Sequence, residues 1–319
     1  MAGRIWGRPV TLVIGTDEAG YGPNLGPLTV AATAWEVAAD PEAVEDALAG
    51  AVAALPEQLW GDSKAIYRAG AGFDRLERGV LVALGLAGEP PPVGWPSLAA
   101  ALRLEVGGEP PEQETLERLG VPRHPQPAGS SSQTADVRRQ LAERGVRLAA
   151  VRCRIVQPRE FNGLLDRGLN KSDILSQVTL DLAASLARSV APDGGPLVIW
   201  CDRHGGRRRY APQVTRAFAT PLVSPLEETA GRSSYRIGAA GRIEFSVGGE
   251  SRTPVAVASM TAKYLRELSM EAFNSFWTAR QPQLVATAGY PVDAARWRRD
   301  AAAAVEQAGL AWDAIWRRA

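Results

Sequence analysis

Cysteine and histidine are nearly absent from this chain, whose 319 residues include two of each. Cys153 and Cys201 cannot supply a disulfide framework or a zinc set, and His124 and His204 cannot build a histidine-rich metal centre. No apolar run is long enough to span a membrane, and no basic segment followed by a long apolar one opens the chain. We therefore expect a soluble, cytoplasmic protein without a membrane partner.

Excess charge of either sign is also absent, because the formal net charge at pH 7 is +1. The net charge of the chain therefore does not by itself indicate a nucleic-acid partner. Arginines do cluster locally, and we interpret each cluster as a solvated surface. The clusters lie at residues 207–209, at 296, 298 and 299, and at 317–318.

Two adjacent acids follow the first apolar run of the chain. Residues 10–14 predict a short buried strand, after which Asp17 and Glu18 precede the loop Gly20-Tyr21-Gly22. Carboxylates at a strand end suit Mg²⁺ or Mn²⁺, which prefer oxygen ligands, although a solvated turn has the same composition. Neighbouring strand residues point to opposite faces, so both acids serve one site only if the chain twists there, as the glycines permit.

Asp202 repeats this pattern, because it ends the apolar strand predicted at residues 197–201. An amphipathic helix is predicted at 171–190, and strands alternating with helices favour an α/β domain with a mixed sheet. The carboxyl ends of adjacent parallel strands share one edge of a sheet. We therefore expect Asp17, Glu18 and Asp202 to converge around a cation.

The remaining segments divide the chain into a core and insertions. We expect residues 1–85 and 146–319 to form the two parts of a catalytic core, interrupted by a proline-rich insertion or lid at 86–145. The second part should contain an inserted hairpin at about 228–247 and C-terminal helices. Other elements are predicted as strands at 10–16, 27–36, 147–156 and 219–223, a hairpin at 235–247 and a long helix at 255–277.

Five short motifs, in order along the chain, resemble those of the type 2 ribonuclease H family, which covers ribonucleases HII and HIII. They are residues 14–22 with 26–28, Asp62-Ser63-Lys64, Cys201-Asp202, residues 248–252 with 256–263, and Gly289-Tyr290-Pro291. The resemblance implies a ribonuclease H-like fold, with a mixed five-stranded central sheet flanked by helices and with insertions atypical of the family.

The resemblance also implies an activity and its metal ligands. The expected activity is metal-dependent endonuclease cleavage of the RNA strand, or of embedded ribonucleotides, in RNA–DNA duplexes by a monomer using two Mg²⁺ or Mn²⁺ ions. The implied metal-binding and catalytic acids are Asp17, Glu18, Asp202 and Glu250. Glu267 is the competing candidate for the fourth acid, and its alternative role is a helix-surface partner of Lys263.

Substrate contacts follow from the same resemblance. They are implied at Gly20, Tyr21, Gly22, Lys64, Lys263 and Tyr290, whereas Lys171 and the arginines at 203 and 207–209 are weaker candidates for phosphate contact and are interpreted as solvated surface. Tyr21 departs from the family pattern, which has a basic residue there. We hypothesise that the grip on phosphate is weakened, or that the ring packs against a sugar or base.

Two other functions compete with a nuclease. A non-catalytic relative would bind nucleic acid through the same groove. An actin-like phosphotransferase also starts with a Gly-Thr-Asp strand, but it needs a second glycine loop, and the chain has neither that loop nor a P-loop signature.

Overall fold

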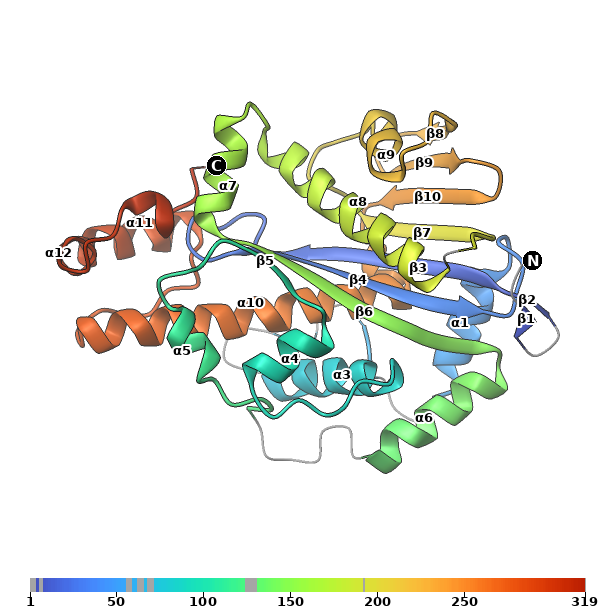
Figure 1. The fold of residues 1–319 in the computed structure, drawn as a ribbon, viewed down its shortest axis with the longest axis horizontal. Coiled ribbons are helices and arrows are strands. Elements are labelled where there is room, and N and C mark those ends of the chain that lie inside the picture. The colour runs from blue at the N-terminus through green and yellow to red at the C-terminus, as the bar shows by residue number, and fades with distance from the viewer. Residues whose placement is uncertain are drawn as a thin grey trace.

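A mixed eight-stranded sheet forms the centre of the part of the chain described by this computed structural model, which is residues 4–5, 8–55, 59–61, 66–67, 72–123, 131–191 and 193–318. The strand order is β5-β6-β4-β3-β7-β10-β9-β8, and helices cover both faces (Figure 1). The strands are β3 (Thr11–Ala19), β4 (Leu28–Val37), β5 (Glu105–Gly107), β6 (Val146–Val156), β7 (Leu197–Asp202), β8 (Val223–Glu228), β9 (Arg232–Ile237) and β10 (Gly241–Ser246). A separate small ribbon pairs β1 (Arg4–Ile5) with β2 (Arg8–Pro9).

The predicted α/β class with a mixed sheet is confirmed, but the predicted number of five strands is wrong. Segments 86–145 and 203–249 contribute strands to the same sheet. β5 pairs in parallel with β6, and β10 pairs in parallel with β7 while β9 and β8 continue the sheet beyond it. The strand predicted at 219–223 is also wrong, because the chain leaves a helix there through Ala219 in the left-handed region and β8 begins only at Val223.

Two apolar cores lie on opposite faces of the sheet. Strand alternation sends Val13 of β3 into one core, with α10 and α3, and Leu12 and Ile14 into the other, with α8. Figure 1 shows α10 and α8 on the two sides of the sheet. The helices are α1 (Val44–Ala53), α3 (Phe73–Leu86), α4 (Trp95–Ala101), α5 (Gln113–Glu117), α6 (Ser131–Glu143), α7 (Pro158–Asp166), α8 (Lys171–Val190), α9 (Ala211–Phe218), α10 (Thr253–Arg280), α11 (Pro291–Asp300) and α12 (Ala302–Gln307), with short 3₁₀ turns η1 (Gly249–Ser251) and η2 (Trp312–Ala314).

Helix α8 has the bounds that its sequence predicts. Asn170 caps its first turn, because its side-chain oxygen accepts a hydrogen bond from the Asp173 amide. The Asp173 carboxylate in turn accepts a hydrogen bond from the Asn170 amide. Ile174 and Leu175 begin its buried stripe against the sheet. None of the helices in the described ranges combines the length and apolarity that crossing a membrane requires.

A third apolar cluster joins the C-terminal helices to the loop after β3. Leu25 from that loop is buried with Phe273 and Trp277 of α10 and with Trp297 of α11. Asn24 and Leu25 also donate backbone hydrogen bonds to the Gly289 carbonyl. The segment that follows the glycine loop is therefore anchored in a packed core.

Gly15 is the point at which α10 meets β3. A Cβ atom on this residue would overlap the backbone carbonyl of Pro254, in the first turn of α10. Thr33 on the neighbouring strand donates a hydrogen bond of 2.8 Å to the same carbonyl oxygen. The absence of a side chain at Gly15 lets the helix start directly on the sheet.

Gly15→Ala should therefore destabilise the protein by about 3 kcal/mol, because backbone atoms must shift to make room. Gly50→Ala is the matched control, because Gly50 is an exposed residue of helix α1 with open space around it. Alanine there should raise the free energy of unfolding by about 0.5–1 kcal/mol. Urea unfolding measures both. Equal stability of Gly15→Ala and wild type would contradict the close approach of α10.

Candidate metal centre and cleft

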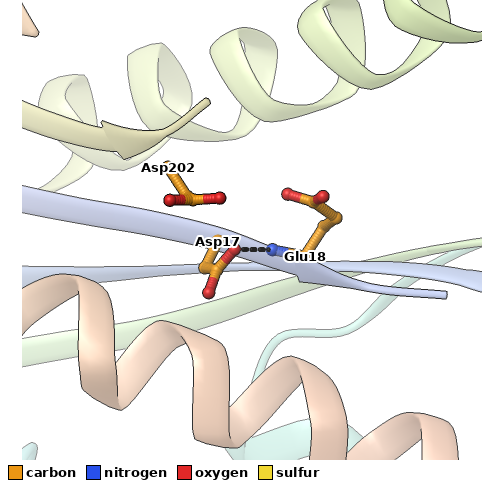
Figure 2. A group of neighbouring side chains, drawn as sticks. All are labelled: Asp17, Glu18 and Asp202. Carbon is orange, nitrogen blue, oxygen red and sulfur yellow. Dashed lines mark hydrogen bonds between the residues drawn. The ribbon is translucent and has the colours of Figure 1, made fainter. Parts of the chain in front are cut away.

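Three of the four predicted acids lie together at the carboxyl end of β3. Strands β3 and β7 pair in parallel up to Thr16 and Cys201, so that the next residues in register are Asp17 and Asp202. One carboxylate oxygen from each of Asp17, Glu18 and Asp202 lies within 4.8 Å of the others. Figure 2 shows the three side chains converging beside β3.

The strand does not break before these acids. It pairs with β4 through Glu18 and Ala19, and the first left-handed residue is Gly20, with φ 86°. Asp17 is on the α10 side, where it has a side-chain hydrogen bond with Ser259, and Glu18 follows on the opposite face. The expected twist at the glycines is thus unnecessary, because Asp202 at the adjacent strand end is close to both acids.

Burial and crowding disfavour the charged forms of these carboxylates. Burial, and next the charge of Asp202, raise the pKa of Asp17 to about 7, although hydrogen bonds from Ser259 and the Glu18 amide oppose the rise. That amide donates to Asp17 Oδ1 at 2.7 Å. Burial, Asp17 and Asp202 likewise raise the pKa of Glu18 well above its ordinary value. A divalent cation with oxygen ligands fits this donor set, because it would neutralise the repulsion.

Glu250 and Glu267 occupy different parts of the same cleft. Glu250 lies outside the 4.8 Å group, but its charge contributes to raising the pKa of Asp17, and the neighbouring Gly249 amide donates to Asp202 Oδ1 at 3.0 Å. Glu267 accepts a hydrogen bond of 2.9 Å from the Tyr67 hydroxyl. Its other oxygen is 3.3 Å from Lys263 Nζ, the ion pair that helix spacing predicts.

The acids and four of the other predicted contact residues line one cleft of about 810 Å³, whereas Gly22 is not in its lining. Gly20, Tyr21, Lys263 and Tyr290 are in its wall, and Lys263 Nζ lies 4.6 Å from the centre of the Tyr67 ring. Tyr290 is 55% exposed, and its ring is 3.9 Å from where a Cβ of Gly22 would lie. Lys64 and its motif lie outside the described residues.

Two buried arginines donate hydrogen bonds to backbone carbonyls of the glycine loop and of neighbouring residues. Arg266 donates to the carbonyls of Pro27 and Ala288, at 3.1 and 2.9 Å. Arg317 donates to the Gly20 carbonyl at 2.6 Å and also to that of Pro23. The interpretation of the 317–318 cluster as a solvated surface is wrong for Arg317, which is only 1% exposed.

Several solved structures of ribonucleases HII and HIII are similar to this chain. A chain of the PCNA:RNase HII complex from Archaeoglobus fulgidus has 15% identity and a TM-score of 0.42, over 96% of this chain and 94% of that one. Ribonuclease H2 from Pyrococcus horikoshii OT3 has 13% identity and a TM-score of 0.43, over 96% and 92%. Bst-RNase HIII in complex with Mn²⁺ has 14% and 0.43, over 97% and 66%.

No protein-family model matches the chain, and no curated protein sequence matches it.

Asp17→Asn should raise the free energy of unfolding of the metal-free protein by about 1–3 kcal/mol above pH 7. The pKa of Asp17 is about 7 in the folded protein against an ordinary 3.8, so between these values the folded state binds more protons than the unfolded chain. The Asp17 carboxyl group therefore lowers the free energy of unfolding more and more as the pH rises from about 4 to about 7. The gain from asparagine should grow from about pH 4 to 7 and then level, as urea unfolding in EDTA measures.

Asp193→Asn is the control for removing one carboxylate, because Asp193 is exposed in a turn before β7. Its effect should stay within about 0.5 kcal/mol at each pH. A gain for Asp17→Asn that is the same at pH 4.5 and pH 8 would contradict the crowded, buried site.

Proposed function

We propose that this protein is a metal-dependent endoribonuclease that hydrolyses the RNA strand, or embedded ribonucleotides, of RNA–DNA duplexes. The observation that carries the proposal is the group of carboxylates from Asp17, Glu18 and Asp202 within 4.8 Å of one another. Their placement at the carboxyl end of parallel strands, beside an open cleft, is typical of a ligand site in an α/β sheet. The choice of substrate rests on the motifs described from the sequence.

Asp17, Glu18 and Asp202 would hold the metal ions, and we assign Glu250 as the fourth acid. Divalent ions bound there would activate a water molecule for attack on phosphorus and stabilise the leaving 3′-oxygen. The chain's own contribution is orientation. Ser259 and the Glu18 amide fix the Asp17 carboxylate, and the Gly249 amide fixes Asp202.

Preference for RNA requires contact with the ribose 2′-hydroxyl. The backbone at Gly20 and Gly22 would make that contact, because Gly20 lines the cleft with its carbonyl held by Arg317, and Gly22 carries no side chain that would block approach. The exposed ring of Tyr290 faces Gly22 and would pack against an adjacent sugar. Lys263, on α10, would approach a phosphate from the same side of the sheet as Asp17.

Purified protein should cleave the labelled RNA strand of an RNA–DNA hybrid when Mg²⁺ or Mn²⁺ is added, and it should leave the DNA strand intact. Asp202→Asn should lower the rate by more than about 100-fold, the upper end for residues that merely orient metal ligands. A duplex with one embedded ribonucleotide, assayed in parallel, shows which substrate is preferred. Binding of the hybrid without cleavage under either metal would instead favour a non-catalytic protein.

The fourth acid is tested by comparing two glutamines in the same assay. Glu250→Gln should lower the cleavage rate by more than about 100-fold, whereas Glu267→Gln, which breaks only a contact with Lys263 and Tyr67, should lower it less than about 10-fold. The reverse order would transfer the assignment to Glu267.

Metal binding has a readout that does not depend on turnover. Mn²⁺ at 100 times its dissociation constant should raise the free energy of unfolding by about 2.7 kcal/mol, because the ions bind the folded site and not the unfolded chain. Asp202→Asn should lose most of this gain, while Asp193→Asn should keep it. Equal stabilisation of all three proteins would show that the ions bind elsewhere.

A further inference from the structure

Tyr21 forms a contact with helix α8 that the proposed reaction does not explain. The Nζ atom of Lys171, the first residue of α8, lies 4.6 Å from the centre of the Tyr21 ring. Gly205 closes another side of this ring, since a Cβ there would lie 2.8 Å from the Tyr21 hydroxyl oxygen. The aromatic ring is thus held in place, and an ammonium group is near its face, as in a cation–π contact.

The polar partners of Lys171 differ from those of the two arginines beside it, within the ranges that the structure describes. Arg207 forms an ion pair with Asp173 and donates to Ser172 Oγ at 3.0 Å. Arg203 donates to the Arg207 carbonyl at 2.9 Å. In the described part of the chain, by contrast, no carboxylate lies within ion-pair distance of Lys171 Nζ. Its ammonium group therefore remains available to an external anion.

The Tyr21 ring that the Lys171 ammonium faces lines the cleft of the candidate metal centre. Burial, and next the charge of Glu18, raise the pKa of the Tyr21 hydroxyl, which places the ring within the electrostatic reach of the acids. Burial, and next the charge of Arg317, lower the pKa of Lys171, and Arg317 holds the Gly20 carbonyl. Lys171 on α8 and Lys263 on α10 belong to helices on opposite faces of the sheet.

We propose that Lys171 binds a phosphate group of the nucleic-acid substrate, and that Tyr21 is a positioning residue that holds its ammonium at the glycine loop. This inference rests on the proposed function, because a phosphate backbone is the anion that an RNA–DNA duplex would bring to the carboxylate cluster. A nucleic-acid strand that crosses the edge of the sheet would then contact one lysine on each side of the acids. Lys171 and Lys263 together would fix the path of that strand over Gly20 and Gly22.

The test is binding of a fluorescent RNA–DNA hybrid by anisotropy, with Mg²⁺ present and in the Asp202→Asn background to prevent cleavage. Lys171→Met should weaken binding by about 3- to 10-fold at ~0.1 M salt. It should also reduce the slope of log K against log salt by about one, as expected when one phosphate contact is lost. Lys171→Arg should restore both, because a guanidinium also stacks on an aromatic ring.

Variants of Tyr21 separate positioning from a general structural role. Tyr21→Phe keeps the ring face and should bind the hybrid as the reference does. Tyr21→Leu should weaken binding by much of the amount that Lys171→Met does. The double variant Tyr21→Leu with Lys171→Met should bind no more weakly than Lys171→Met alone. Arg188→Met is the control, since Arg188 is exposed about 26 Å away in the last turn of the same helix.

An unchanged affinity and salt slope for Lys171→Met would overturn the phosphate contact. Additive losses in the double variant would overturn the positioning role of Tyr21. If the reference protein binds no duplex at all, the proposed function fails and this inference fails with it, which distinguishes that outcome from the first two.

Discussion

Repulsion among the carboxylates at the end of β3 is the constraint that the rest of the structure must overcome. The apolar cores that flank the sheet fix the register of β3 and β7, and this register places Asp17 beside Asp202 whether or not their side chains attract. Gly15 allows α10 to start against β3, which brings Ser259 to Asp17. The stability of the scaffold thus maintains a cluster of carboxylates whose repulsion is relieved by a bound cation or by protonation.

Two buried arginines hold the glycine loop and the residues that follow it through hydrogen bonds to backbone carbonyls. Burial, and next the charge of Arg266, lower the pKa of Arg317 to about 9, so that Arg317 remains charged at neutral pH. Both arginines donate to backbone carbonyls of the loop and of residue 288, which leaves the carboxylates to the cleft. The C-terminal residues therefore determine the conformation of a loop that begins at residue 20.

Sequence patterns predicted the central strands, helix α8 and the meeting of Asp17 with Asp202, because apolar runs and strand-end acids are local signals. They did not predict that β5 and β8 join the main sheet, since periodicity shows which face of an element is apolar and not which elements pair. The burial of Arg317 was missed for a related reason: its sequence neighbours are typical of a surface, and only packing around Phe161 and the loop reveals its environment.

Strand alternation gives the candidate site two sides. Asp17 faces the α10 layer and Glu18 faces the α8 layer, so neither helix alone encloses both acids. A ligand that contacts both must approach along the edge of the sheet, between the glycine loop and the end of β7. Each layer also begins a helix at this edge, with α10 starting against Gly15 and α8 starting against Tyr21. An extended polymer with regularly spaced charges suits this geometry better than a compact ligand, because its successive groups can reach both layers at once.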